Sequence, residues 1–306
     1  MSLIRLLKGS KPVLGGKILP ERREVTTPVR RRRTPALASE RQVVARAGTL
    51  KSFIDAQDGS LEQSRIASDY IHVSSLLNFC PRRLWLALND NQNVIEVPRS
   101  ADRVVWAMGR AAEHHVRTQI IHALNFEQAY GRWTCKCEQS IQTGHFPKNI
   151  TCLTCNGPLD RYIELSLFDH ELRIVGNPDL ILIIIGGKAT IVEIKSINKR
   201  EFDELKTPKA SHVFQGTAYH RLFRGSFELE DAIAIIYVCK DYTFKSPYKE
   251  FSVPYQQLDN IVERAFDEVR LFRETQSLPQ RLEVCSSMQT STAKNCALCV
   301  NCFSRR

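Results

Sequence analysis

Apolar side chains recur every three and four residues in several stretches of the chain, and this spacing predicts amphipathic helices. The clearest helix is expected over residues 101–124, with an apolar stripe of Val105, Met108, Ala112, Val116 and Ile120. Further helices are expected over 74–88, 208–223 and 255–273. In the first of these three, Ser74 and Ser75 are the expected N-caps, and Pro81 is expected to kink or restart the helix.

Shorter runs of apolar and β-branched residues predict strands at 162–168, 172–185, 190–194 and 232–238. Gly186 and Gly187 are expected to turn the chain between the second and third of them. Strands and helices in this order predict an α/β (α+β) fold, in which helices flank a small central mixed sheet. No apolar run approaches the roughly 20 residues of a membrane span, which excludes a membrane protein.

Charge divides the chain into two parts. The net charge is +10, and the first 51 residues hold 13 Lys and Arg against 3 Asp and Glu, so the remainder is balanced. This segment contains four prolines and the run Arg30, Arg31, Arg32 and Arg33, with no helical or strand period. We therefore expect residues 1–60 to be a disordered basic arm that can bind phosphate backbones without sequence preference. A mitochondrial presequence is a minority alternative, because acids are few but serine is scarce and the segment is long.

The overall composition, 43% hydrophobic and 25% charged, is that of a globular protein with a sizeable core. It excludes a collagen-like fibre and a wholly disordered chain. The start of the sequence shows no short apolar stretch followed by a small-residue cleavage site. We therefore expect a cytoplasmic protein of a bacterial, archaeal or phage-infected cell.

The ten cysteines are clustered, and in a reducing compartment close thiolate pairs are metal ligands more often than disulfides. One cluster consists of Cys135, Cys137, Cys152 and Cys155. A connecting hairpin would bring its two pairs together around a tetrahedral Zn²⁺, so we expect an inserted zinc ribbon at about 131–158. His145 is the alternative to one of these thiolates. Cys239 follows an apolar run and is expected to be a buried, inert thiol.

Three charged residues of the central strands carry candidate catalytic chemistry. Glu193 and Lys195 are two apart in a strand and therefore project from one face. If the loop between the two strands has an odd number of residues, such as residues 186–188, Asp179 pairs with Lys195 and all three groups lie on that face. A two-residue loop would instead place Asp179 opposite Ile194. Two neighbouring carboxylates repel unless a divalent cation bridges them, and oxygen ligands suit Mg²⁺ or Mn²⁺. Such a face can hydrolyse a phosphodiester, although alone the pattern also fits a strand whose charged face is solvated.

These residues, together with others in the same order, resemble the PD-(D/E)XK nuclease superfamily and specifically its RecB-like branch. The resemblance covers residues 70–305. It rests on the segments Gly109-Arg-Ala-Ala-Glu113-His114, Gly176-x-x-Asp179, Glu193-x-Lys195 and Gln215-Gly-x-x-Tyr219. It implies a restriction-endonuclease-like nuclease domain over 61–306 in which Asp179 and Glu193 bind the catalytic metal and Lys195 orients the attacking water.

The resemblance also implies roles for residues on two helices. The family places a metal-site His or Glu four residues after the glycine, where this chain has Glu113 followed by His114. Glu113 is therefore the expected third ligand and His114 the alternate. Gln215 and Tyr219 match the branch's Gln…Tyr motif, which borders the active site and the DNA, and their spacing puts them on one helix face.

The segment beginning Cys80-Pro81-Arg82 resembles the N-terminal cysteine motif of iron–sulfur RecB-like nucleases, including the CRISPR-adaptation exonucleases. There, one cysteine before the core and three after it ligate a [4Fe–4S] cluster. The implied set in this chain is Cys80, Cys296, Cys299 and Cys302. The terminal cluster at 285–302 also permits a self-contained zinc site of Cys285, Cys296, Cys299 and Cys302, because both metals accept four thiolates.

The expected function is that of a Mg²⁺- or Mn²⁺-dependent DNA nuclease, an exonuclease or a processor of single-stranded ends. It would act on DNA in recombination, repair or phage genome processing, with a protein partner in such a complex. The alternative is a non-catalytic DNA-binding or assembly protein on the same scaffold, for instance a phage structural component.

Overall fold

The computed structural model describes residues 70–89, 100–183, 187–241, 246–275, 277–296 and 298–305, all of which belong to one compact unit. The predicted basic arm at 1–60, with Arg30, Arg31, Arg32 and Arg33, lies outside the described residues. Among the helices that the model does describe, none is both long and apolar enough to cross a membrane.

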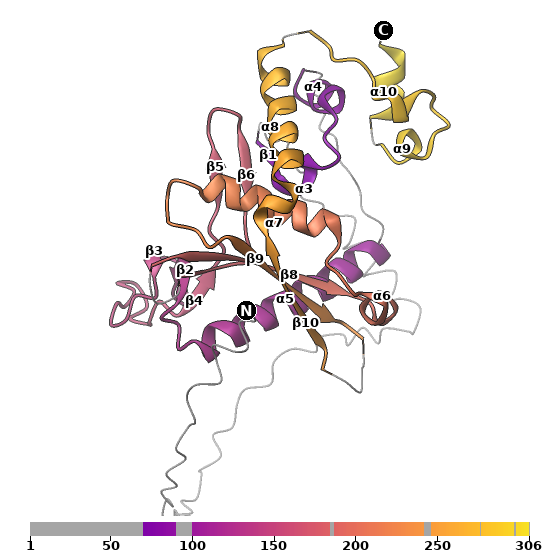
Figure 1. Cartoon of the computed structure of the whole chain (residues 1–306). Helices are drawn as coiled ribbons and strands as arrows, with labels where there is room; N and C mark the ends of the chain where they lie inside the picture. The colour runs from indigo at the N-terminus through magenta and orange to yellow at the C-terminus, as the bar shows by residue number, and fades with distance from the viewer. Residues whose placement is uncertain are drawn as a thin grey trace, which may run out of the picture. The chain divides into compact units, whose positions relative to one another are not determined.

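A mixed seven-stranded sheet forms the centre of the fold (Figure 1). Its order is β10-β9-β8-β7-β2-β3, and β4 also pairs with β2. Of the described strand pairs in this sheet, β8–β9 is parallel and the others are antiparallel. The strands are β2 (Ala129–Thr134), β3 (Ile141–His145), β4 (Arg161–Ile163), β7 (Leu180–Ile183), β8 (Ala189–Ile197), β9 (Ala232–Cys239) and β10 (Tyr248–Pro254).

A second sheet of three short strands lies beside the first, in the order β1-β6-β5. Its strands are β1 (Ile71–His72), β5 (Leu167–Asp169) and β6 (Ile174–Gly176). The strands predicted at 162–168 and 172–185 are therefore each two strands, one in each sheet. Asn177 and Pro178 separate β6 from β7, and a proline, which has no N–H to donate, is suited to such a break between ladders.

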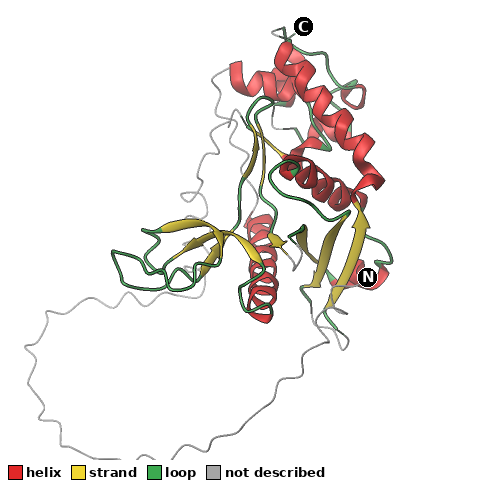
Figure 2. Cartoon of the chain, turned by 60° about the vertical axis from the view of Figure 1, so that its left-hand side comes forward, coloured by secondary structure: helices red, strands yellow, loops and turns green. Residues whose placement is uncertain are grey.

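Two helices cover opposite faces of the central sheet (Figures 1 and 2). In α5 (Ser100–Ala123), Gly109 lies so close to Ser196 that an added Cβ would be 2.9 Å from its Oγ. In α7 (Ala210–Phe223), a Cβ added to Gly216 would be 2.5 Å from the Ile233 side chain. Through the β8–β9 register, Ser196 and Ile233 belong to opposite faces. The predicted mixed sheet flanked by helices is thus confirmed.

The predicted helix over 101–124 is confirmed as α5, but its apolar stripe is only partly buried. Val105 and Met108, near its beginning, are 49% and 53% exposed, whereas Val116 is buried. The apolar side chains of this helix are therefore buried mainly in its second half, where Glu113 also lies.

The N-terminal helical region differs from the prediction in its boundaries. It consists of α3 (Val73–Leu76) and α4 (Pro81–Asn89). Because α3 follows His72 as its N-cap, Ser74 and Ser75 lie inside the helix, and the prediction that they cap it is wrong. Pro81 begins α4, as expected for a residue whose missing N–H costs nothing at a first helical position.

The remaining elements cover the end of the chain. The helix predicted over 255–273 begins as a 3₁₀ turn, η2 (Tyr255–Leu258), and continues as α8 (Asp259–Glu274). The other short elements are α6 (Lys199–Glu204), η3 (Glu283–Cys285), α9 (Ser291–Lys294) and α10 (Cys299–Ser304).

Candidate functional site

The candidate active site forms where β7 and β8 separate, because their pairing ends at Leu180 and Val192. Beyond this point, no described strand pairs with β8 on its β7 side. The backbone N–H of Ile194 donates instead to Asp179 Oδ2 at 2.7 Å. The N–H and hydroxyl of Ser196 donate to Glu113 Oε1 at 3.1 and 3.2 Å. Two carboxylates are thus held at the edge of β8 by backbone donors that the sheet leaves open.

The β7–β8 register corrects one detail of the sequence prediction. Five residues separate the paired Ile183 and Ala189, so the connection between the strands has an odd number of residues, as the proposed clustering of the three charged groups requires. Extending the register by one residue places Asp179 across from Glu193, however, and not from Lys195. The predicted pairing is wrong by two residues, which is one full strand period, and the three charged groups therefore still share one face.

Glu193 is the most deeply buried charged group of this face, at 2% exposure. Its Oε1 lies 2.5 Å from Lys195 Nζ, while its Oε2 is buried without a hydrogen-bond partner among the described residues. Burial, together with the charge of Asp179, raises the pKa of Glu193 to about 8. An ionised carboxylate with an unsatisfied buried oxygen is unfavourable unless a further cation completes it.

Asp179 shares this environment. Burial raises its pKa to about 7, against the lowering effects of Lys195 and of the Ile194 N–H. Burial lowers the pKa of Lys195, but the charges of Glu193 and Asp179 outweigh it, so that its pKa is raised overall. Burial and mutual charge thus perturb all three groups, as at many functional sites. Within the described residues, the carboxylate oxygens of Asp179, Glu193 and Glu113 are not gathered within 4.8 Å of one another as the finger sulfurs are.

Two residues that sequence reasoning missed also lie at the site. Arg117, on α5, forms ion pairs with Glu164 and with Asp179, the latter at 3.9 Å. Glu164 follows β4, and its charge contributes to the raised pKa of Asp179. Arg117 lies four residues after Glu113, which is one helical turn, and this spacing was the signal available in the sequence. His114, the alternate ligand, lies beside Arg117 at 3.3 Å, whereas Glu113 contacts β8.

The predicted Gln–Tyr pair lies on one face of α7 and points toward the carboxylates. Gln215 Nε2 donates to the Tyr219 hydroxyl at 2.6 Å. Tyr219 packs so closely on Gly176 that an added Cβ there would be 2.6 Å from its ring. Burial, followed by the charge of Glu193, raises the pKa of Tyr219, so the phenol stays protonated.

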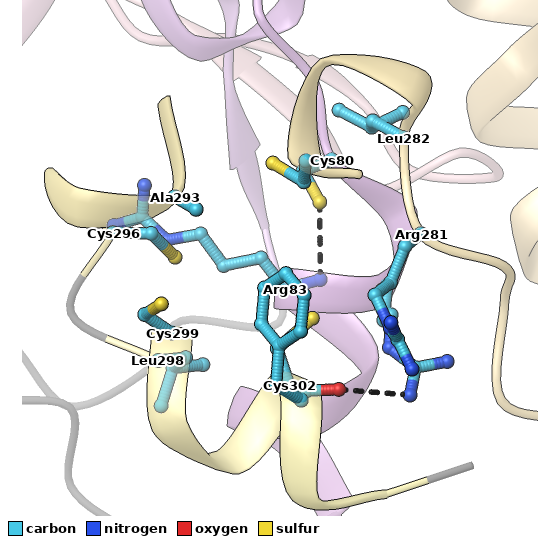
Figure 3. A pocket seen from close by; sticks show the side chains of 12 residues that line it. Cys80, Arg83, Arg281, Leu282, Ala293, Cys296, Leu298, Cys299 and Cys302 are labelled. Atoms are coloured by element: carbon cyan, nitrogen blue, oxygen red, sulfur yellow. Dashed lines mark hydrogen bonds between the residues drawn. The ribbon is translucent and has the colours of Figure 1, made fainter. Parts of the chain in front are cut away.

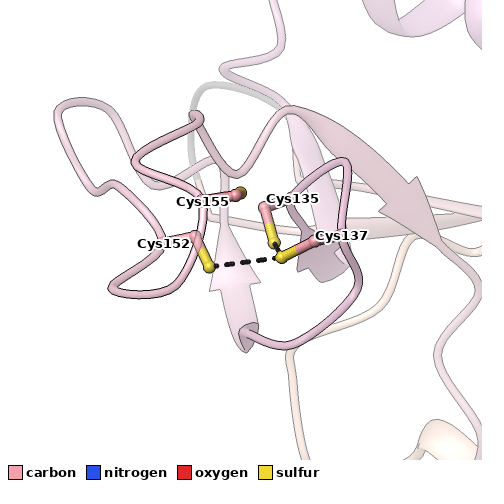
Figure 4. Close-up of side chains that lie close together, drawn as sticks. All are labelled: Cys135, Cys137, Cys152 and Cys155. Carbon is pink, nitrogen blue, oxygen red and sulfur yellow. Dashed lines mark hydrogen bonds between the residues drawn. The ribbon is translucent and has the colours of Figure 1, made fainter.

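The cysteines of the insertion converge on one point (Figure 4). The Sγ atoms of Cys135, Cys137, Cys152 and Cys155 all lie within 4.8 Å of one another. Two of the pairs are 3.2 and 3.6 Å apart, close to the roughly 3.8 Å that Zn–S bonds of 2.3 Å give in a tetrahedron. These four thiols can hold a metal ion.

Neighbouring donors stabilise the thiolate form of Cys152. The Ser140 hydroxyl donates to Cys152 Sγ at 3.1 Å, and the Thr154 N–H donates to the same sulfur at 3.3 Å. Led by the Ser140 bond, these contacts lower the pKa of Cys152 to about 5. His145 is exposed and packs on the Tyr130 ring, outside this sulfur group.

The cysteine finger, defined as residues 131–163 with β3 and β4, grows out of the central sheet. Strand β2 pairs with β7 through Ala129 and Tyr130 and then with β3 and β4. Within the finger, Trp133 is fully buried and packs on Phe146 and Tyr162. The finger is therefore an extension of the sheet that also supplies Asp179.

The terminal cysteines line one pocket (Figure 3). They are Cys80, Cys285, Cys296, Cys299 and Cys302. The pocket has a volume of about 30 Å³, and both sets considered in the sequence lie around it. Burial, and then the proximity of Cys296, Cys302 and Cys285, raises the pKa of Cys80 against the bond from the Arg83 N–H. Within the described residues, the terminal sulfurs are not drawn together to 4.8 Å as in the finger.

Arg82 joins the two ends of the described chain next to this pocket. Its buried guanidinium donates to the carbonyl oxygens of Pro279 (2.7 Å), Cys302 (3.1 Å) and Arg305 (2.5 Å). The residue after Pro81 thus fastens α4 to the C-terminal segment. Cys239 lies elsewhere, buried as predicted, and its thiol donates to the Asp241 carbonyl.

Comparisons with solved structures yield distant neighbours, among them the two that follow. The crystal structure of SSO0001 has a TM-score of 0.43 and 15% identity, over 85% of this chain and 98% of that one. An alkaline exonuclease, LHK-Exo from Laribacter hongkongensis, has a TM-score of 0.42 and 13% identity, over 71% of this chain and 91% of that one. No protein-family model and no curated protein matches the chain. We therefore infer function from the geometry of the site itself.

Proposed function

We propose that this chain is a metal-dependent nuclease that hydrolyses phosphodiester bonds of DNA, acting on single-stranded segments or ends. The observation that carries the proposal is the buried, unpartnered Oε2 of Glu193 beside two further carboxylates and a lysine. This donor set fits a hard divalent cation such as Mg²⁺ or Mn²⁺.

The ligands would be Asp179, Glu193 and Glu113. A cation held there polarises a phosphoryl oxygen and lowers the pKa of a bound water. Lys195, protonated and 23% exposed, orients the attacking water and offsets charge that develops on the phosphate. Gln215 and Tyr219, from the facing helix, position the substrate.

We further propose that the two cysteine clusters are structural metal sites. The finger thiols, which converge within 4.8 Å, suit a single Zn²⁺. The terminal thiols line one pocket, and Cys80, Cys296, Cys299 and Cys302 are the four that we propose as ligands of a [4Fe–4S] cluster, which takes four thiolates. Iron and zinc analysis of the purified protein, with its visible absorption, distinguishes this from a second zinc held by Cys285 in place of Cys80.

The nuclease proposal is tested by degradation of linear single-stranded DNA in Mn²⁺. Asp179→Asn and Lys195→Ala should each lower the rate at least about 100-fold, because each removes a group that acts on the reacting phosphate. Asp267→Asn, an exposed aspartate on α8, is the matched control and should retain the wild-type rate. Equal degradation by all four proteins would identify a contaminant.

The third ligand is tested by Glu113→Gln against His114→Gln. Glu113 contacts β8, whereas His114 lies beside Arg117, so only the first change should raise the Mn²⁺ concentration needed for half-maximal rate. A folded wild-type protein that binds DNA but never cleaves it would instead establish the non-catalytic DNA-binding or assembly alternative.

A further inference from the structure

A second pocket lies between α3 and the first turns of α7, two elements that are adjacent in Figure 1. Its volume is about 210 Å³. The side chains that matter for its chemistry are Ser74, Leu77, Asn78, Ser211, His212 and Gln215. Only Gln215 among these belongs to the motifs found in the sequence.

The lining of this pocket is uncharged and combines polar side chains with the apolar Val73, Leu77 and Phe214. The side chains of Ser74, Asn78 and Ser211 form no hydrogen bond to any described residue, so their donors and acceptors remain available to a ligand. His212 is neutral, because burial and then the charge of Lys195 lower its pKa to about 4. Leu77, 42% exposed, adds an apolar surface.

The pocket adjoins the carboxylate face at two points. His212 Nδ1 is 2.8 Å from the Tyr237 hydroxyl, and Tyr237 is the β9 register partner of Lys195. Gln215 is bonded to Tyr219, whose ring packs against Gly176 just before Asp179. Each of these two contacts links a pocket residue to a tyrosine that lies beside the segment carrying Lys195 or Asp179.

We propose that this pocket is a nucleoside subsite, which holds the base and sugar adjoining the phosphodiester that is cut. The inference rests on the proposed nuclease function and names how that site recognises its substrate. The described lining contains no Lys or Arg, so a phosphate is not the favoured occupant. Hydroxyls and amides that both donate and accept match the edges of a base and the oxygen atoms of a sugar.

The size and chemistry of the pocket also set its selectivity. A volume of about 210 Å³ lies below the range of roughly 300–1,000 Å³ for drug-sized ligands, and so fits one nucleoside and not several. Rotatable hydroxyls adapt to any base edge. We therefore expect the subsite to require a base without choosing strongly among the four.

The experiment combines pocket variants with abasic oligonucleotides. The triple variant Ser74→Ala, Asn78→Ala, Ser211→Ala removes the free polar groups. Ser75→Ala is the matched control, since Ser75 is an exposed neighbour on the same helix outside the pocket. Single-stranded oligonucleotides carry one abasic residue at successive positions, and their affinity is measured by fluorescence anisotropy in a Lys195→Ala background, which prevents cleavage.

We expect the triple variant to weaken binding of the intact oligonucleotide about tenfold. With the pocket intact, an abasic residue at one position should lower the affinity by a similar factor. In the triple variant the abasic residue should cause no further loss of affinity. Ser75→Ala should change neither the affinity for the intact oligonucleotide nor the effect of the abasic residue. In the cleavage-competent protein, the triple variant should raise KM and leave kcat within about twofold. If no abasic position affects binding, or if its effect persists in the triple variant, the pocket does not hold a nucleoside.

Failure of the nuclease proposal has a different signature. If the wild-type protein never cleaves DNA, yet the abasic effect appears only with an intact pocket, the subsite is supported and the nuclease proposal is refuted. If cleavage is normal and depends on Lys195 but the abasic effect is missing, the nuclease proposal is supported and the subsite is refuted.

Discussion

The two cysteine clusters of this protein differ in how far apart their ligands lie in the sequence. In the finger, all four thiols come from one insertion between neighbouring strands and converge within 4.8 Å. In the terminal cluster, Cys80 lies more than 200 residues before Cys296 and meets it only in the folded chain. The finger can therefore organise a local segment, whereas the terminal cluster joins the two ends of the core.

Because of this difference in sequence separation, metals bound at the two clusters would contribute differently to the stability of the fold. Closing a long loop removes more entropy from the unfolded chain than closing a short one. The terminal cluster is also reinforced by Arg82, which bonds three carbonyls of the C-terminal segment. If both clusters hold a metal, as proposed, removing the terminal one should weaken the whole core, and removing the finger one only its own part of the sheet.

The largest expected effect is that of Cys80→Ser. If Cys80 is a ligand, the change should lower the free energy of unfolding by about 5 kcal/mol, because the long loop is no longer closed. Cys285→Ser should cost less than about 1 kcal/mol. Urea unfolding and metal content measure both. The reverse order, with Cys80→Ser mild, would favour the self-contained zinc set and remove the contrast between the clusters.

Next is Cys137→Ser in the finger. It should abolish one equivalent of bound zinc and speed amide hydrogen exchange at least about tenfold within the finger, while exchange in α8 stays unchanged. Local loosening is expected because every ligand of this site lies within the insertion. Cys239→Ala, which touches neither cluster, is the control. Faster exchange throughout the core would show that the finger, too, supports the global fold.

Arg82→Ala should have a smaller effect, lowering the free energy of unfolding by about 2 kcal/mol. It leaves three carbonyls near the terminal pocket without their buried donor. Arg200→Ala, an exposed arginine in a helix ion pair, should change stability by less than about 0.5 kcal/mol and serves as the comparison. Equal effects of the two changes would mean that Arg82 does not join the chain ends in solution.

The last comparison sets the carboxylate site against both thiol sites. In the metal-free protein the pKa of Glu193 is raised to about 8, so the folded chain holds a proton that the unfolded chain releases near pH 4.5. Stability from this group is therefore present at low pH and falls as pH rises toward 8, by about 1 kcal/mol per pH unit. Glu193→Gln should flatten the dependence, as measured by urea unfolding at pH 5.5–8 with chelator present. Metal-bound thiolates show the opposite sign, because their binding strengthens as pH rises.

Residues that are close in the sequence were predicted most successfully. The insertion's four cysteines converge as their spacing required, α5 and α7 form where the helical period placed them, and Glu193 and Lys195 share a face because they are two apart in a strand. The strand over 172–185 was predicted as one element. Its division at Asn177 and Pro178 depends on two different sheets competing for its halves, which no local pattern records.

Sequence alone determined the chemistry available to this protein: which residues are thiols, carboxylates and amines, and which of them a period of two or of 3.6 puts on one face. Tertiary structure decided which of these groups meet. The separation of β7 from β8 leaves the Ile194 and Ser196 amides open to Asp179 and Glu113, and it brings Arg117 and Glu164 to the same place. The physical reason is that strand and helix periods act over a few residues, whereas the burial of carboxylates and the pocket beside α7 depend on packing between segments far apart in the chain.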